Sequence, residues 1–153
     1  MSWRFEATYY RTALLLGLVQ GDAVHRWAER LIERESSPPH EILELVLIPA
    51  TDLSAMRHAL WPLVIDPEPP EVLRGILELI SADFVAGRRS AEDTVTVLRQ
   101  MRSMLRLPAP LYSELNQALV AHGLAKGTGG TIGTWLQRFA PGAGASSGDA
   151  DPM

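Results

Sequence analysis

Apolar side chains recur along this chain every three or four residues, which is the period of an α-helix. The clearest case is segment 22–35, where one face is apolar and the opposite face carries charges. The apolar face consists of Val24, Trp27, Ala28, Leu31 and Ile32. Segments that alternate between apolar and polar residues around an Asn-Gly or Asp-Gly turn, which would indicate a β-hairpin, are missing. We therefore predict an all-α fold, a compact bundle or a short α-solenoid-like array of about seven or eight short helices.

Proline, glycine and short polar residues mark the expected helix boundaries. The expected helices cover about 5–20, 22–35, 40–48, 52–61, 70–86, 90–105, 108–125 and 132–139. Gly21 is expected at a helix C-terminus in left-handed geometry, with Asp22 capping the next helix. Asp52 and Ser90 are expected N-caps of later helices, and Gly87 is expected to close the helix that precedes Ser90.

The length and composition suit one folded domain. The chain has 153 residues, of which 46% are hydrophobic and 21% charged, so it has enough apolar surface to bury a core. Residues 140–153 consist mainly of Gly, Ala, Ser, Pro and Asp and contain no aromatic residue. We predict a single helical domain over 1–139 and a disordered tail over 140–153.

Cysteine usage and hydropathy point to a compartment. The chain contains no cysteine, which excludes disulfides, thiolate metal sites and a cysteine nucleophile. Its longest apolar runs are far shorter than the roughly 20 residues of a membrane-spanning helix. The N-terminal residues lack the apolar core of a secretion signal. We therefore expect a cytoplasmic protein that does not contact membranes.

The charges are unevenly distributed. Residues 1–80 hold 7 arginines and 12 carboxylates, whereas the whole chain has a net charge of −4. A protein that binds nucleic acid through phosphate contacts needs a concentrated basic face. Because this chain is acidic, we expect no nucleic-acid partner.

Two sets of charged residues are candidate contacts for a protein partner. Glu29, Glu33, Glu41 and Glu44 lie on the second and third expected helices. An acidic face of this kind steers a basic partner toward the protein. The second set, a basic stripe for an acidic partner or a phosphate backbone, consists of Arg99, Arg102 and Arg106. The alternative for both sets is a solvated helix face.

No catalytic set is assembled in the sequence. His25 and Glu29, and likewise His40 and Glu44, lie four residues apart and would suit a helical metal site if the pairs met, but surface contacts explain them more simply. The glycines of 126–130 follow the lysine, which is the wrong order for a phosphate loop, and Gly-x-Ser-x-Gly does not occur. We expect no enzymatic activity, no cofactor and no metal.

Asp83 and His122 are ionisable residues on the expected apolar faces of two helices. A buried ion is costly unless it is paired. The two side chains therefore either meet or bond a neighbouring helix terminus. If they meet, they form an acid–base dyad of a small enzyme or ligand binder; the alternative is a structural contact.

The first fifty residues resemble a group of small all-helical bacterial proteins of uncertain function. The resemblance rests on the apolar run 13–19, on the amphipathic segment 24–32 with its single Trp27, and on Pro38-Pro39. Some members lie beside polymorphic toxins and are taken as immunity proteins. The resemblance implies a non-enzymatic protein that binds one partner, such as a basic toxin domain. The alternative is a structural or adaptor subunit, which also allows a homo-oligomer.

Overall fold

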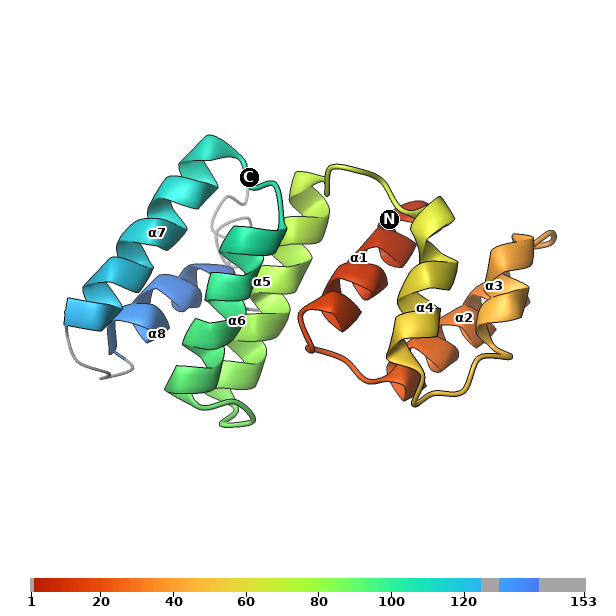
Figure 1. The fold of residues 1–153 in the computed structure, drawn as a ribbon, viewed down its shortest axis with the longest axis horizontal. Helices are drawn as coiled ribbons and strands as arrows, with labels where there is room; N and C mark the ends of the chain where they lie inside the picture. The colour runs from red at the N-terminus through yellow and green to blue at the C-terminus, as the bar shows by residue number, and fades with distance from the viewer. Residues whose placement is uncertain (1, 125–129, 141–153) are drawn as a thin grey trace, which may run out of the picture. The chain divides into compact units, whose positions relative to one another are not determined.

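The computed structural model describes residues 2–124 and 130–140. These residues form eight α-helices and two 3₁₀-helices, with no β-strand among them (Figure 1). The predicted all-α fold is confirmed. Of the predicted disordered tail, only Ala140 falls within the described residues. In this part of the chain, no helix is long and apolar enough to cross a membrane.

The helices group into two compact units, residues 1–73 and 74–153. In chain order they are α1 (Trp3–Leu15), α2 (Gly21–Arg34), α3 (His40–Leu45), α4 (Leu53–Leu60), η1 (Trp61–Leu63), α5 (Pro70–Val85), α6 (Ala91–Met104), α7 (Ala109–Leu124), α8 (Gly130–Leu136) and η2 (Gln137–Phe139). The boundary between the units falls inside α5. The expectation of one domain over 1–139 stays a prediction.

Three of the expected caps are present. Asp52 Oδ1 accepts a hydrogen bond from the Ala55 amide at 3.1 Å, and Ser90 Oγ accepts one from the Asp93 amide at 3.1 Å. Gly87 has a φ of 75°, the left-handed conformation that ends α5. These contacts join residues close in sequence, which is why local patterns predict them.

The connection between α1 and α2 differs from the prediction. The first helix ends at Leu15 rather than near Gln20, and the glycine with left-handed geometry is Gly17, whose φ is 71°. Gly21, expected in that role, is instead the first residue of α2 and is buried. Asp22 therefore lies inside the helix and is not its N-cap.

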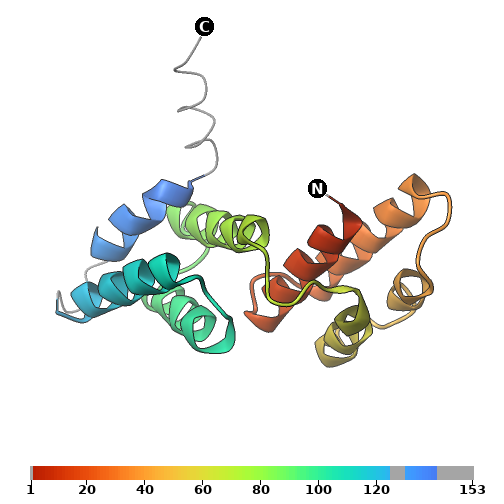
Figure 2. The ribbon, with the colours of Figure 1, turned by 90° about the horizontal axis from the view of Figure 1, so that it is seen from above.

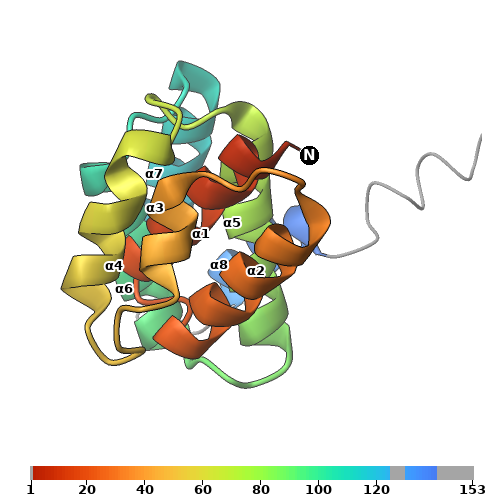
Figure 3. The ribbon, with the colours of Figure 1, turned by 90° about the vertical axis from the view of Figure 1, so that its right-hand side faces the viewer.

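The unit of residues 1–73 has its own apolar core. Helix α1 packs on α2 and α4, and α3 packs on both α2 and α4 (Figures 2 and 3). Trp27 anchors this core, because its ring stacks on Tyr10 at 5.0 Å and its Nε1 donates to Glu6 Oε1 at 2.9 Å. The largest fully buried side chains of the core are those of Leu14, Leu31, Ile42, Leu45, Met56 and Leu60.

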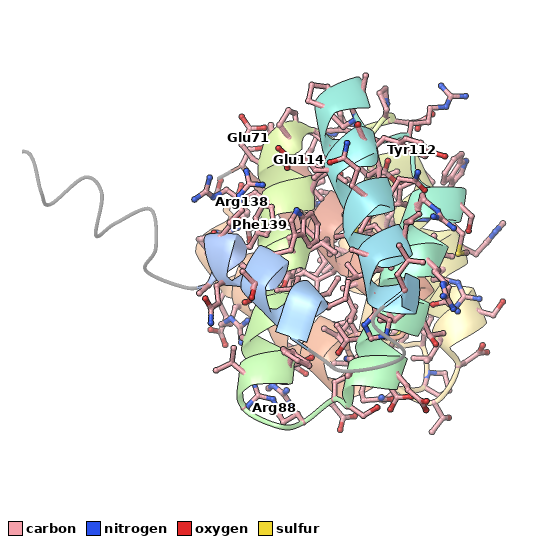
Figure 4. The ribbon with its side chains drawn as sticks, turned by 90° about the vertical axis from the view of Figure 1, so that its left-hand side faces the viewer. Glu71, Arg88, Tyr112, Glu114, Arg138 and Phe139 are labelled. Carbon is pink, nitrogen blue, oxygen red and sulfur yellow. The ribbon has the colours of Figure 1, made fainter. Side chains whose placement is uncertain are left out.

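The unit of residues 74–153 forms a second core. Helix α7 packs on α6 and α8. Among its buried apolar residues are Ile76, Ile80, Leu98, Met101, Leu115, Ile132 and Leu136. At the surface, Arg138 of η2 donates to Glu114 Oε2 of α7 at 2.9 Å (Figure 4).

Candidate functional site

The four predicted acidic contacts lie on two helices that touch. Glu29 and Glu33 are exposed on α2, and Glu44 is exposed on α3, whereas Glu41 is half-buried. Helices α2 and α3 pack against each other (Figure 3). His40 is the local partner of Glu44, with 2.9 Å between its Nε2 and Glu44 Oε1. Such an exposed pair is held weakly and leaves the carboxylate accessible.

Two exposed leucines lie on and just after α3, the helix that carries Glu41 and Glu44, and the sequence analysis missed them. Leu43 of α3 is 41% exposed and Leu47, just after the helix, is 82% exposed. The signal was present, because segment 42–48 has more apolar residues than one buried helix face can hold. Ile42 and Leu45 take the buried positions, so Leu43 is left facing outward. We call the four glutamates with Leu43 and Leu47 the α2–α3 surface.

The three predicted basic residues have separate environments. Arg102 Nη1 donates to Asn116 Oδ1 at 2.7 Å, so its side chain joins α6 to α7. Arg99 is exposed on α6, and Arg106 is exposed beyond the end of α6. One of the three therefore has a structural partner, and the two others remain accessible.

Asp83 and His122 are both buried as expected, with 8% and 6% exposure. The Asp83 carboxylate accepts from Arg88 Nε at 3.0 Å and from Arg89 Nη2 at 3.4 Å. The chain reverses at Gly87, and the Arg88 amide donates back to the Asp83 carbonyl at 2.9 Å. This reversal after the helix brings both arginines to the carboxylate. The described structure therefore pairs Asp83 with arginines, and the alternative of an Asp83–His122 dyad is not formed.

His122 lies instead beside a polar hollow of about 360 Å³. The hollow is lined by Glu92, Val95, Thr96, Arg99, His122 and Gly123. The Nδ1 atom of His122 is buried without a hydrogen-bond partner among the described residues. The hollow combines a carboxylate, a guanidinium and an imidazole, which are groups able to hold a small polar molecule.

Residues 2–124 and 130–140 bring together no group of three or more His, Asp or Glu side chains that could hold a metal ion. No family model, curated protein or solved structure matches this chain. Its function is therefore inferred from its own surface.

Proposed function

We propose that this protein is a non-enzymatic protein-binding module, most concretely a cytoplasmic immunity protein that binds a basic bacterial toxin domain and covers its active site. The observation that carries the proposal is the α2–α3 surface. It comprises two exposed leucines on or just after α3 and four carboxylates on α2 and α3, two helices that pack against each other.

The leucines would supply the affinity of such a contact. Leu47 is 82% exposed, so a partner that covers it removes most of its apolar surface from water. Full burial of a leucine side chain contributes about 1.5–3 kcal/mol. Binding energy in protein interfaces is concentrated in a few such anchors surrounded by polar residues.

The carboxylates would increase the association rate and make the contact selective for a basic partner. Glu29, Glu33, Glu41 and Glu44 carry the same sign of charge, and the first half of the chain is acidic as a whole. Complementary charge accelerates association with a basic protein and penalises acidic competitors. A basic toxin domain fits this chemistry, since it must approach nucleic acid or another anionic target.

A structural or adaptor role is the second candidate, and a different surface favours it. Tyr112, Val120 and Leu124 of α7 are 47%, 55% and 80% exposed. Their spacing of eight and four residues places them on one side of the helix. A homo-oligomer would cover this stripe, and light scattering on the pure protein separates an oligomer from a monomer.

The immunity proposal is tested by comparing variants of the immobilised full chain as bait in a lysate of its host. We expect the wild-type chain to retain a basic toxin, and the purified chain to abolish the activity of that toxin. Leu47→Asp should weaken binding about tenfold or more, as for loss of an interface anchor. A variant with glutamine in place of all four glutamates, Glu29, Glu33, Glu41 and Glu44, should associate more slowly with the toxin. Its association rate should also depend less on the salt concentration.

Val120→Asp on α7 is the matched control, because it places the same charge on an exposed apolar position outside the α2–α3 surface. A toxin whose affinity falls equally in both aspartate variants would contradict the assignment of the surface. Recovery of no specific toxin would contradict the function itself.

A further inference from the structure

A second hollow, of about 420 Å³, lies within residues 1–73 where α1 packs on α4 and η1. Its lining consists of Arg11, Ser54, Arg57, His58 and Trp61. The four residues from α4 and η1 are spaced three, four and seven positions apart, so they share one helix face. Arg11 reaches the hollow from α1, which makes three of its five lining side chains basic or potentially basic.

Arg11 lacks the carboxylate partner that several other arginines of the chain have. Arg34, Arg74 and Arg138 each pair with a described carboxylate, whereas Arg11 forms no such pair with the residues that the structure describes. Its Nε atom is buried and meets no acceptor in that part of the chain. Its guanidinium carbon lies 4.5 Å from the ring centroid of Trp61, a cation–π contact that leaves the N–H donors unused. The terminal Nη atoms of Arg11 are not among the buried atoms without a partner, so they are the donors that a ligand in the hollow would meet.

Arg11 lies among charges of both signs. Burial is the largest influence and lowers the pKa of Arg11, and the nearby positive charge of Arg57 lowers the pKa further. Glu68, whose influence is larger than that of Arg57, and Asp66 act in the opposite direction and raise the pKa of Arg11. Two cations near each other in a partly buried site repel, and an anion held between them would relieve this repulsion.

We propose that this hollow binds the phosphate group of a small phosphomonoester whose organic part lies against Trp61. A phosphate carries close to two negative charges and several strong acceptor oxygens, which match two guanidiniums with Ser54 and His58 as further donors. Trp61 is 54% exposed and offers a flat apolar surface to an adjoining ring. The volume lies within the range of small-molecule sites. The site uses α1, α4 and η1 and shares no residue with the α2–α3 surface.

The test is titration of the full-length protein with phenyl phosphate, inorganic phosphate and benzoate, followed by calorimetry and by the NMR signal of Arg11 Nε–H. We expect phenyl phosphate to bind saturably with one molecule per chain and to shift the Arg11 Nε–H signal, because the phosphate contacts the terminal Nη atoms of the same guanidinium. Inorganic phosphate should bind up to about tenfold more weakly, since it lacks a ring to contact Trp61. Benzoate, with one charge and two oxygens, should bind more weakly than phenyl phosphate.

Three variants locate the site. Arg57→Gln should lower the affinity for phenyl phosphate about tenfold, as expected for the loss of one charge-assisted hydrogen bond. Arg26→Gln removes the same charge from an exposed position on α2 and should change the affinity less than about twofold. Trp61→Leu should abolish the preference for phenyl phosphate over inorganic phosphate.

Three results would overturn the proposal. The first is the absence of saturable binding of phenyl phosphate up to about 10 mM, roughly ten times the dissociation constant of a 1 mM ligand. The second is equal weakening of binding by Arg57→Gln and Arg26→Gln. The third is that benzoate binds as tightly as phenyl phosphate. If Arg57→Gln fails to fold, the wild-type protein still decides the matter, since an Arg11 Nε–H signal unmoved by saturating phenyl phosphate rules out the site.

Discussion

Gly21 shows how one residue can depend on a distant neighbour. It is buried at the first position of α2, and a Cβ atom at this position would overlap the backbone carbonyl of Ala50. Backbone cannot move aside as the end of a flexible side chain can. The start of α2 can therefore approach the segment before α4 only with a hydrogen in place of a side chain.

Gly21→Ala should accordingly lower the free energy of unfolding by about 2 kcal/mol, the usual cost of overpacking a tight site. Urea denaturation followed by circular dichroism measures this. Gly123→Ala is the control, because a Cβ there meets nothing within 4 Å and the position lies inside α7. Alanine has a higher helix propensity than glycine, so this variant should be as stable as the wild type or up to about 1 kcal/mol more stable. Equal effects of the two substitutions would contradict the close approach to Ala50.

Asp83 should matter for stability through its two arginine contacts. Asp83→Asn removes the charge that accepts from Arg88 and Arg89 at a position only 8% exposed. We expect a loss of about 1.5 kcal/mol in the free energy of unfolding. Glu78→Gln, which removes an exposed pair with Arg74 on the same helix, should cost about 0.5 kcal/mol or less. If Asp83→Asn and Glu78→Gln lose the same free energy of unfolding in parallel urea titrations, the stabilising role of the Asp83–arginine contacts is contradicted.

At the scale of single elements, helix starts were predicted best. Asp52 and Ser90 cap α4 and α6 as expected, because a cap is a contact between residues three apart. The end of α1 was predicted poorly. Leu16 and Leu18 continue its apolar pattern and are buried, but they lie outside the helix in a chain reversal at Gly17. Apolar periodicity reports burial, and burial alone does not tell a helix from the turn that follows it.

Ser90→Ala should destabilise the protein by about 1 kcal/mol, since it leaves the Asp93 amide without its capping acceptor. The matched control is Ser103→Ala in the same helix. Ser103 is exposed and its hydroxyl bonds only carbonyls of its own helix, Arg99 and Gln100. Alanine there should change stability by less than about 0.5 kcal/mol. Thermal unfolding of both variants provides the comparison, and an unchanged midpoint for Ser90→Ala would show that the cap contributes nothing.

At the scale of the whole molecule, the two units share one helix. The residues of α5 up to Leu73 belong to one unit, and those from Arg74 belong to the other. Helix formation is cooperative along the chain, so unfolding of one unit should weaken α5 on both sides of the boundary. The prediction of a single domain therefore implies a single unfolding transition.

A core variant in one unit tests this coupling. Leu98→Ala creates a cavity in the core of residues 74–153 and should cost about 2–5 kcal/mol. In a urea titration followed by NMR, the amide signals of α2 and of α6 should lose intensity at one shared midpoint, lowered for both by the substitution. A midpoint that falls for α6 alone would show two independently unfolding domains.

The sequence by itself determined that this protein is helical, where α4 and α6 begin, and that Asp83 and His122 are buried. Those features depend on apolar period and on contacts within a few residues, which sequence records directly. Only the tertiary structure decided that Leu43 and Leu47 are exposed, that Asp83 pairs with arginines, and that Arg11 meets Trp61. The last contact joins residues on different helices, and the exposed face of α3 depends on where α2 and α4 pack. Such choices arise from competition among several apolar faces for the same core, which no local pattern resolves.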